Sequence, residues 1–168
     1  MSCRTATPVH VARVPFTQFH QTLESAIGYF ELGMAAEALR ELDTLPETDQ
    51  TEEEVLEMRL VLNQHLGCWE EAAAAAEALC HLRGADADRY ITWGCCLCEL
   101  GRFEECRRAL ELAPAEARSN ALWNYHRACC EAVLGNPESA RHLVRHSLSI
   151  DPTLRPLAEG NGHLKALL

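Results

Sequence analysis

Apolar and polar positions recur with a helical period along most of the chain. Between residues 17 and 32 the large apolar side chains fall three or four positions apart, which places them on one face of an amphipathic helix. No segment alternates apolar and polar residues over a useful length, so strands are not expected. The pattern therefore predicts an all-α protein of four antiparallel helix pairs, at residues 17–32 with 35–45, 52–66 with 69–83, 87–100 with 103–112, and 116–134 with 137–150.

A leucine followed by a glycine closes the first helix of each pair. These glycines are spaced 34 residues apart, at Gly33, Gly67, Gly101 and Gly135. Glycine ends a helix by taking a left-handed conformation that other residues resist. Five positions later the side chain is always small, which would let the second helix lie close against the first. The four small residues are Ala38, Ala72, Cys106 and Ala140.

The period, the phase and the small residues resemble the tetratricopeptide repeat, a helix-turn-helix unit of 34 residues. The resemblance covers four repeats, at residues 19–52, 53–86, 87–120 and 121–154. It implies a right-handed α-solenoid, or superhelix, over residues 16–154. Residues 1–15 carry two prolines and no apolar period, so a flexible arm is expected there. Such a stack needs a cover on its last apolar face, so residues 155–168 are expected to form a short C-terminal cap and tail. The alternative for Leu164, Leu167 and Leu168 is self-association in another molecule.

In this family the first helix of each pair lines a concave surface that binds peptides. The resemblance implies a groove that is mostly apolar and acidic at one edge. A slip of one position in the phase would instead make some of these residues ordinary core. The expected partner is a protein or peptide with apolar side chains and some basic ones, because an exposed apolar groove is costly unless something occupies it. The groove residues are Leu23, Ile27, Phe30, Glu57, Val61, Ile91, Cys95, Cys98, Leu122, Tyr125, Cys129 and Val133.

The negative charge lies in the N-terminal half. Residues 1–82 carry 14 acidic and 4 basic side chains, whereas residues 83–168 carry 11 of each. Nucleic acid and anionic membrane surfaces need a basic face, so neither is an expected partner. No segment is long and apolar enough to cross a bilayer. The acidic residues form either a solvated face or a lip that attracts a basic segment.

Nine cysteines, without an export signal, indicate free thiols in a reducing, cytoplasmic compartment. The 14 arginines against one lysine are typical of a GC-rich bacterial genome. Cys95 and Cys98 share a helix face, and Cys129 lies at the equivalent place one repeat later. Because zinc needs four ligands and this pair lies mid-helix, packing is the favoured role. The alternative is a metal- or redox-responsive protein acting through Cys95, Cys98 and Cys129. No cofactor or metal is expected.

The sequence contains no Ser-His-Asp order, glycine-rich phosphate loop or metalloprotease motif, and the short loops leave little room for a catalytic site. The chain is therefore not expected to be an enzyme. The favoured function is a scaffold or adaptor that holds a partner peptide in the groove. The alternative is a dedicated chaperone of the type III secretion class, which would hold a client segment in the same groove.

Overall fold

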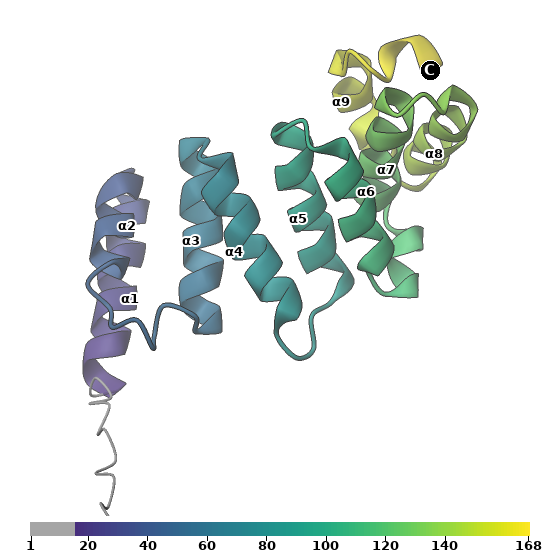
Figure 1. The fold of residues 1–168 in the computed structure, drawn as a ribbon. Helices are drawn as coiled ribbons and strands as arrows, with labels where there is room; N and C mark the ends of the chain where they lie inside the picture. The colour runs from purple at the N-terminus through teal and green to yellow at the C-terminus, as the bar shows by residue number, and fades with distance from the viewer. Residues whose placement is uncertain (1–15) are drawn as a thin grey trace, which may run out of the picture. The chain divides into compact units, whose positions relative to one another are not determined.

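The computed structural model describes residues 16–168, so the predicted arm at residues 1–15 lies outside the described residues. Within residues 16–168 there are helices and no strands, which confirms the all-α prediction. The helices are α1 (Phe16–Glu31), α2 (Ala35–Leu42), α3 (Glu53–Leu66), α4 (Trp69–His81), α5 (Ala87–Glu99), α6 (Phe103–Leu112), α7 (Ala121–Val133), α8 (Pro137–Ile150) and α9 (Arg155–Gly160), with short 3-10 helices η1 (Ala115–Ser119), η2 (Pro152–Leu154) and η3 (Lys165–Leu167) (Figure 1). None of the described helices is both long and apolar enough to cross a membrane.

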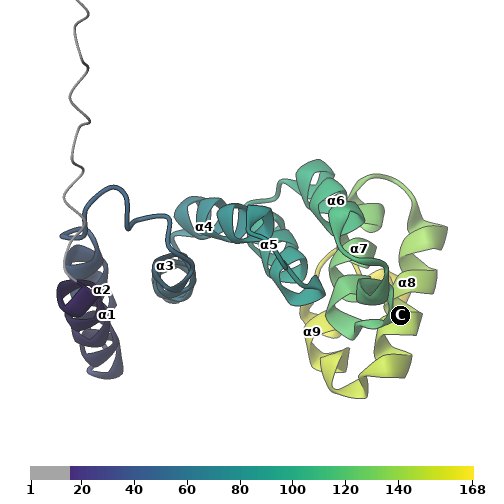
Figure 2. The same ribbon diagram turned by 90° about the horizontal axis from the view of Figure 1, so that it is seen from below.

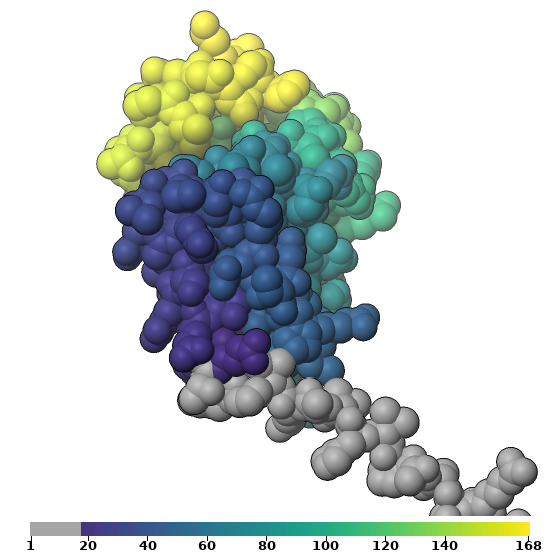
Figure 3. Space-filling view, turned by 90° about the vertical axis from the view of Figure 1, so that its left-hand side faces the viewer, coloured from purple at the N-terminus to yellow at the C-terminus, as the bar shows by residue number. Residues whose placement is uncertain are grey.

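The chain divides into two compact units, Met1–Glu52 and Glu53–Leu168. The first unit contains the α1–α2 pair, whose atoms are drawn in purple and blue in Figure 3. The second unit contains α3 to α9. In it each of the helices α3 to α7 packs on the next one along the chain, and α7 and α8 form the most extensive pair. Helix α5 also packs directly on α7, so the first helices of two successive pairs lie side by side (Figure 2).

A left-handed glycine ends the first helix of every pair, as the spacing predicts. Gly33, Gly67, Gly101 and Gly135 have φ angles of 75°, 71°, 70° and 84°. After each of them, the next backbone N–H donates to the carbonyl five residues back, at 2.8 or 2.9 Å. This is the closing bond of a Schellman motif, which satisfies a carbonyl that the helix end leaves free. The repeated unit is therefore fixed by backbone geometry as well as by packing.

The small residue after each glycine lies in a helix contact. Ala38, Ala72, Cys106 and Ala140 are all 0% exposed, which confirms the predicted register. The approach of α5 to α6 is especially close, because a Cβ placed on Gly94 would lie 2.9 Å from Cδ2 of Leu110. Small side chains at these positions allow the two helices of a pair to approach each other.

Two helix boundaries differ from the prediction by three residues or more, and at both a polar side chain hydrogen-bonds to the backbone. Helix α2 ends at Leu42 rather than residue 45, and the Gln50 amide donates to the carbonyls of Leu42 at 3.0 Å and Leu45 at 2.8 Å. Helix α7 begins at Ala121 rather than residue 116. There Oδ1 of Asn120 accepts the backbone N–H of Leu122 at 2.8 Å, which makes Asn120 the N-cap. The residues before it form η1 instead.

The C-terminal segment covers the end of the last pair, as the short cap predicts. Ala158 and Leu164 are fully buried and pack with Tyr125, Ala128 and Val144. The amide of Asn161 donates to Oη of Tyr125 at 3.2 Å. In Figure 3 this yellow segment forms one continuous layer of atoms. Leu164 is thus buried against its own chain. Self-association through the tail stays a prediction.

Candidate functional site

A cavity of about 620 Å³ opens between α5, α7 and the C-terminal segment of the second unit. We call it the α5–α7 cavity. It forms where the first helices of successive pairs lie side by side, so equivalent faces of α5 and α7 meet across it. Six of the predicted groove residues line it: Ile91, Cys95, Cys98, Leu122, Tyr125 and Cys129.

Burial separates these six residues into wall and surface. Ile91 and Tyr125 are each 5% exposed, and Cys129 is also buried, so these three are core side chains that line the cavity from behind. Leu122 is 40% exposed and is the large apolar side chain among them that solvent can reach. Leu122 is therefore the position where a ligand contact can be tested without disturbing the core.

A second cavity, of about 370 Å³, contains two more predicted residues, Glu57 and Val61. Here the acidic edge is partly neutralised. The Arg89 guanidinium on α5 pairs with Glu57 at 3.1 Å and also with Glu53. Arg102, the N-cap residue of α6, pairs with Glu70 at 3.0 Å. Part of the acidic surface predicted to attract a basic partner therefore binds the protein's own arginines.

The remaining predicted groove residues lie elsewhere. Val133 is exposed at the end of α7 and lines neither of these two cavities. Leu23, Ile27 and Phe30 lie on α1 in the first unit, where Ile27 is exposed and the other two are half-buried. A groove that includes both units stays a prediction.

Sequence reasoning missed the contribution of the C-terminal segment to the α5–α7 cavity. Leu157, Asn161 and His163 form one of its walls. The Asn161 amide contacts Oη of Tyr125 and, at 3.5 Å, Sγ of Cys129. The His163 ring meets the Phe103 ring edge-on, with centroids 5.7 Å apart. The only sequence signal is Gly160-Asn161-Gly162, which indicates a turn but not its location in the fold.

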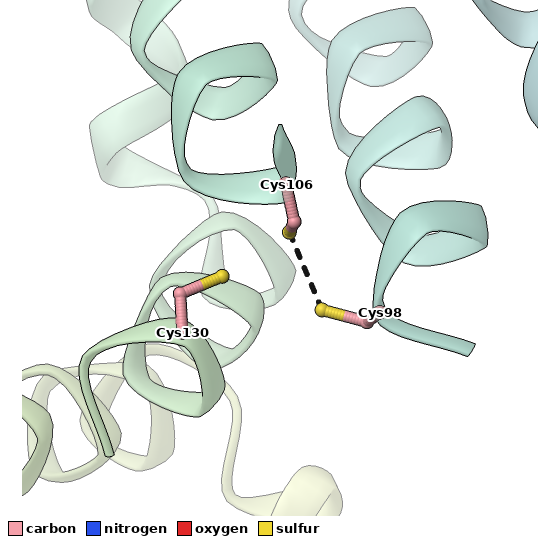
Figure 4. Close-up of side chains that lie close together, drawn as sticks. All are labelled: Cys98, Cys106 and Cys130. Carbon is pink, nitrogen blue, oxygen red and sulfur yellow. Dashed lines mark hydrogen bonds between the residues drawn. The ribbon is translucent and has the colours of Figure 1, made fainter. Parts of the chain in front are cut away.

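Three thiols converge in the core of the second unit, but they are not the predicted three. Cys98, Cys106 and Cys130 come from α5, α6 and α7 and point toward one another (Figure 4). Their sulfurs all lie within 4.8 Å of one another, and those of Cys98 and Cys106 are 3.3 Å apart. The predicted group of Cys95, Cys98 and Cys129 is wrong except for Cys98.

The difference follows from which face of α7 meets α6. Cys130 packs in the same buried cluster as Cys106, whereas Cys129 packs with Tyr125 and the C-terminal segment. Successive helix residues point about 100° apart, so neighbours in sequence enter different clusters. On α5, Cys95 lines the cavity and does not reach the thiol group.

The thiols differ in acidity. Burial raises the pKa of Cys95 to about 11 and that of Cys129 to about 12. In the thiol group, hydrogen bonds from Cys106 and Cys98 lower the pKa of Cys130. Hydrogen bonding within the group also raises the pKa of Cys98 and of Cys106.

Comparisons with known proteins identify the fold. No family model and no curated protein matches the chain. A solved structure of MamA from Desulfovibrio magneticus RS-1 aligns with a TM-score of 0.75 and 17% identity, over 89% of this chain and 83% of that one. A MamA RS-1 ArsTM double mutant gives the same values. PilW, described as a widely conserved type IV pilus biogenesis factor, aligns with a TM-score of 0.66 and 18% identity, over 92% of this chain and 71% of that one.

The chain has a tetratricopeptide-type helical-repeat fold. At these identities the likeness concerns the fold. Because the alignments cover most of the chain, the fold assignment extends across the predicted repeats, while their exact number stays a prediction.

Proposed function

We propose that the chain is a protein-interaction module that binds a partner peptide at the α5–α7 cavity. The observation that carries this proposal is a cavity of about 620 Å³ whose lining includes six of the twelve side chains that the resemblance assigns to a binding groove. Ligand pockets typically span roughly 300–1,000 Å³. Helical-repeat folds use the surface formed by successive units for binding, which supports a non-enzymatic role.

The chemistry of the wall defines the kind of peptide. Leu122 and the half-buried Phe103 offer apolar contacts, while Gln64, Glu99 and Asn161 offer polar ones. We expect an extended or helical segment that places an apolar side chain against Leu122. Glu99 is exposed at this cavity and would favour a basic residue beside that anchor.

The same cavity would also serve a dedicated chaperone of the type III secretion class. A chaperone would hold one aggregation-prone client in a stable complex, whereas a scaffold would bind several partners more weakly. Either function fits a cytoplasmic location, since the eight cysteines of the described residues are all free thiols.

A pair of leucine variants tests the proposal. Leu122→Asp puts a charge at the exposed cavity wall, and Leu112→Asp puts the same charge on α6, at a leucine that is 65% exposed and does not line the cavity. Peptides would be selected from a displayed random library on the wild-type protein, and their affinities measured by calorimetry. Ile91 and Tyr125 are unsuitable positions, because a charge at a buried site would unfold the helices.

The proposal predicts that selected peptides are rich in apolar residues and bind Leu112→Asp as tightly as the wild type. Leu122→Asp should lose at least about tenfold in affinity, the effect of about 1.4 kcal/mol. Equal binding to the two variants, with circular dichroism unchanged, would show that the cavity is not the binding site. Failure to select any peptide would also count against it.

A further inference from the structure

The thiol group lies deep in the second unit and has no role in the proposed peptide contact. Cys106 and Cys130 are fully buried, and Cys98 is half-buried at the α5–α7 cavity. Within residues 16–168, these three thiols are the one set of at least three potential metal ligands whose donor atoms lie close together. Isolated cysteines in a helical core need no explanation beyond packing, whereas three sulfurs from three helices meeting at one point do.

The spacing of the three sulfurs suits a tetrahedral metal ion. A zinc–sulfur bond of about 2.3 Å places two thiolate ligands about 3.8 Å apart in a tetrahedron. The sulfurs of Cys98 and Cys106 lie 3.3 Å apart, and all three lie within 4.8 Å of one another. These separations bracket the value that a bound zinc ion would need, so the three sulfurs require only small adjustments.

A candidate fourth donor lies one helical turn away, outside the 4.8 Å group of the three sulfurs, so its side chain would have to move toward them to share a metal ion. His126 precedes Cys130 by four residues on α7, so the two side chains share a helix face. Its Nδ1 is the one buried side-chain nitrogen or oxygen, within the part of the chain that the structure describes, that lacks a hydrogen-bond partner. Such an atom in a folded core calls for a missing partner. His126 also lines the α5–α7 cavity, as Cys98 does.

We propose that Cys98, Cys106, Cys130 and His126 form a zinc-binding site that joins α5, α6 and α7. The two observations that carry it are independent: the meeting of three sulfurs, and an unpartnered imidazole nitrogen on the helix that supplies one of them. Three thiolates and one imidazole are an established ligand set for structural zinc.

Binding releases the three thiol protons to solvent and leaves a group with one net negative charge. His126 is ready to coordinate as the neutral imidazole, because burial lowers its pKa to about 4. Zn(II) would reach the site from the α5–α7 cavity, where Cys98 and His126 are both found.

The site would also link the third and fourth helix pairs. Because ligands from three helices must be held together, metal binding stabilises the folded arrangement of those helices. Zinc removal would therefore loosen the packing of α5 against α6 and α7 while the helices themselves remain.

The experiment compares metal binding by variants inside and outside the thiol group. Metal-free protein would be titrated with Zn(II) against a chromophoric chelator, and with Co(II) to record visible absorption. Cys106→Ala is the informative variant, since the three equivalent positions carry alanine and the change should not disturb folding. Cys129→Ala and Cys95→Ala are matched controls with thiols outside the group.

We expect one equivalent of Zn(II), and Co(II) bands typical of tetrahedral sulfur coordination. Cys106→Ala should weaken zinc binding by more than about 100-fold, because losing a direct ligand should cost more affinity than losing a residue that only orients a ligand. Cys129→Ala and Cys95→Ala should bind as the wild type does. His126→Gln should weaken binding and alter the Co(II) spectrum. The proposal is overturned if the wild type binds no zinc, if Cys106→Ala binds equally well, or if His126→Gln leaves affinity and spectrum unchanged.

Discussion

Gly94 and Gly28 form a matched pair for testing how closely the helices of a pair approach. Both lie inside helices, in α5 and α1. A Cβ on Gly94 would lie 2.9 Å from Cδ2 and 3.1 Å from Cγ of the buried Leu110, whereas a Cβ on Gly28 would meet nothing within 4 Å. The same chemical change therefore adds crowding at one site alone.

The magnitude follows from two opposing terms. Alanine is better than glycine inside a helix by about 0.5–1 kcal/mol, so Gly28→Ala should stabilise the α1–α2 pair by that amount. Overpacking a closely packed core costs about 1–3 kcal/mol. Leu110 can shift slightly, which favours the lower end of that range. We expect Gly94→Ala to be neutral or to destabilise the second unit by up to about 2 kcal/mol.

The assay is urea unfolding of each variant. Far-ultraviolet circular dichroism follows all helices, and tryptophan fluorescence follows the second unit, because the three tryptophans lie there at Trp69, Trp93 and Trp123. If Gly94→Ala stabilises the second unit as much as Gly28→Ala stabilises the first, the close approach of α5 to α6 is wrong.

Two further variants test particular hydrogen bonds. Asn120→Ala removes the N-cap of α7 and should destabilise the second unit by about 1 kcal/mol in urea unfolding. The control is Ser119→Ala, at the exposed neighbouring residue, which should cost less than about 0.5 kcal/mol. Equal effects of the two variants would argue against the cap. Asn161→Ala removes the amide that contacts Tyr125 and should speed amide hydrogen exchange in residues 155–168 while exchange in α3 and α4 stays unchanged. Unchanged exchange in that segment would mean that Asn161 does not hold it in place.

Much of the fold could be predicted because local chemistry determines it. A left-handed glycine and a small residue five positions later act within a single helix pair, so Gly67 with Ala72 or Gly135 with Ala140 can be recognised from sequence alone. The start of α7 was predicted five residues too early, although Asn120 directly precedes an apolar stretch and is a preferred N-cap residue. Its role was missed because η1 continues the helical pattern before it.

The candidate sites depended on information that repeat spacing does not contain. Tyr125 and Asn161 are 36 positions apart, and nothing in the pattern shows that the C-terminal segment packs on that face of α7. The thiol group depends on whether Cys129 or Cys130 faces α6, a difference of about 100° around one helix. The repeat register predicted the cavity wall from α5 and α7, but it could not give the packing of the C-terminal segment that completes the cavity.

The most direct test of the peptide site is a methyl NMR titration of isoleucine-labelled protein with a selected peptide. The chain has three isoleucines: Ile91 lines the α5–α7 cavity, Ile27 lies on α1, and Ile150 ends α8. The account predicts that the Ile91 methyl signal shifts on peptide addition while the Ile150 signal does not, and an additional shift of Ile27 would extend the site to the first unit. A shift of Ile150 with no change at Ile91 would contradict it.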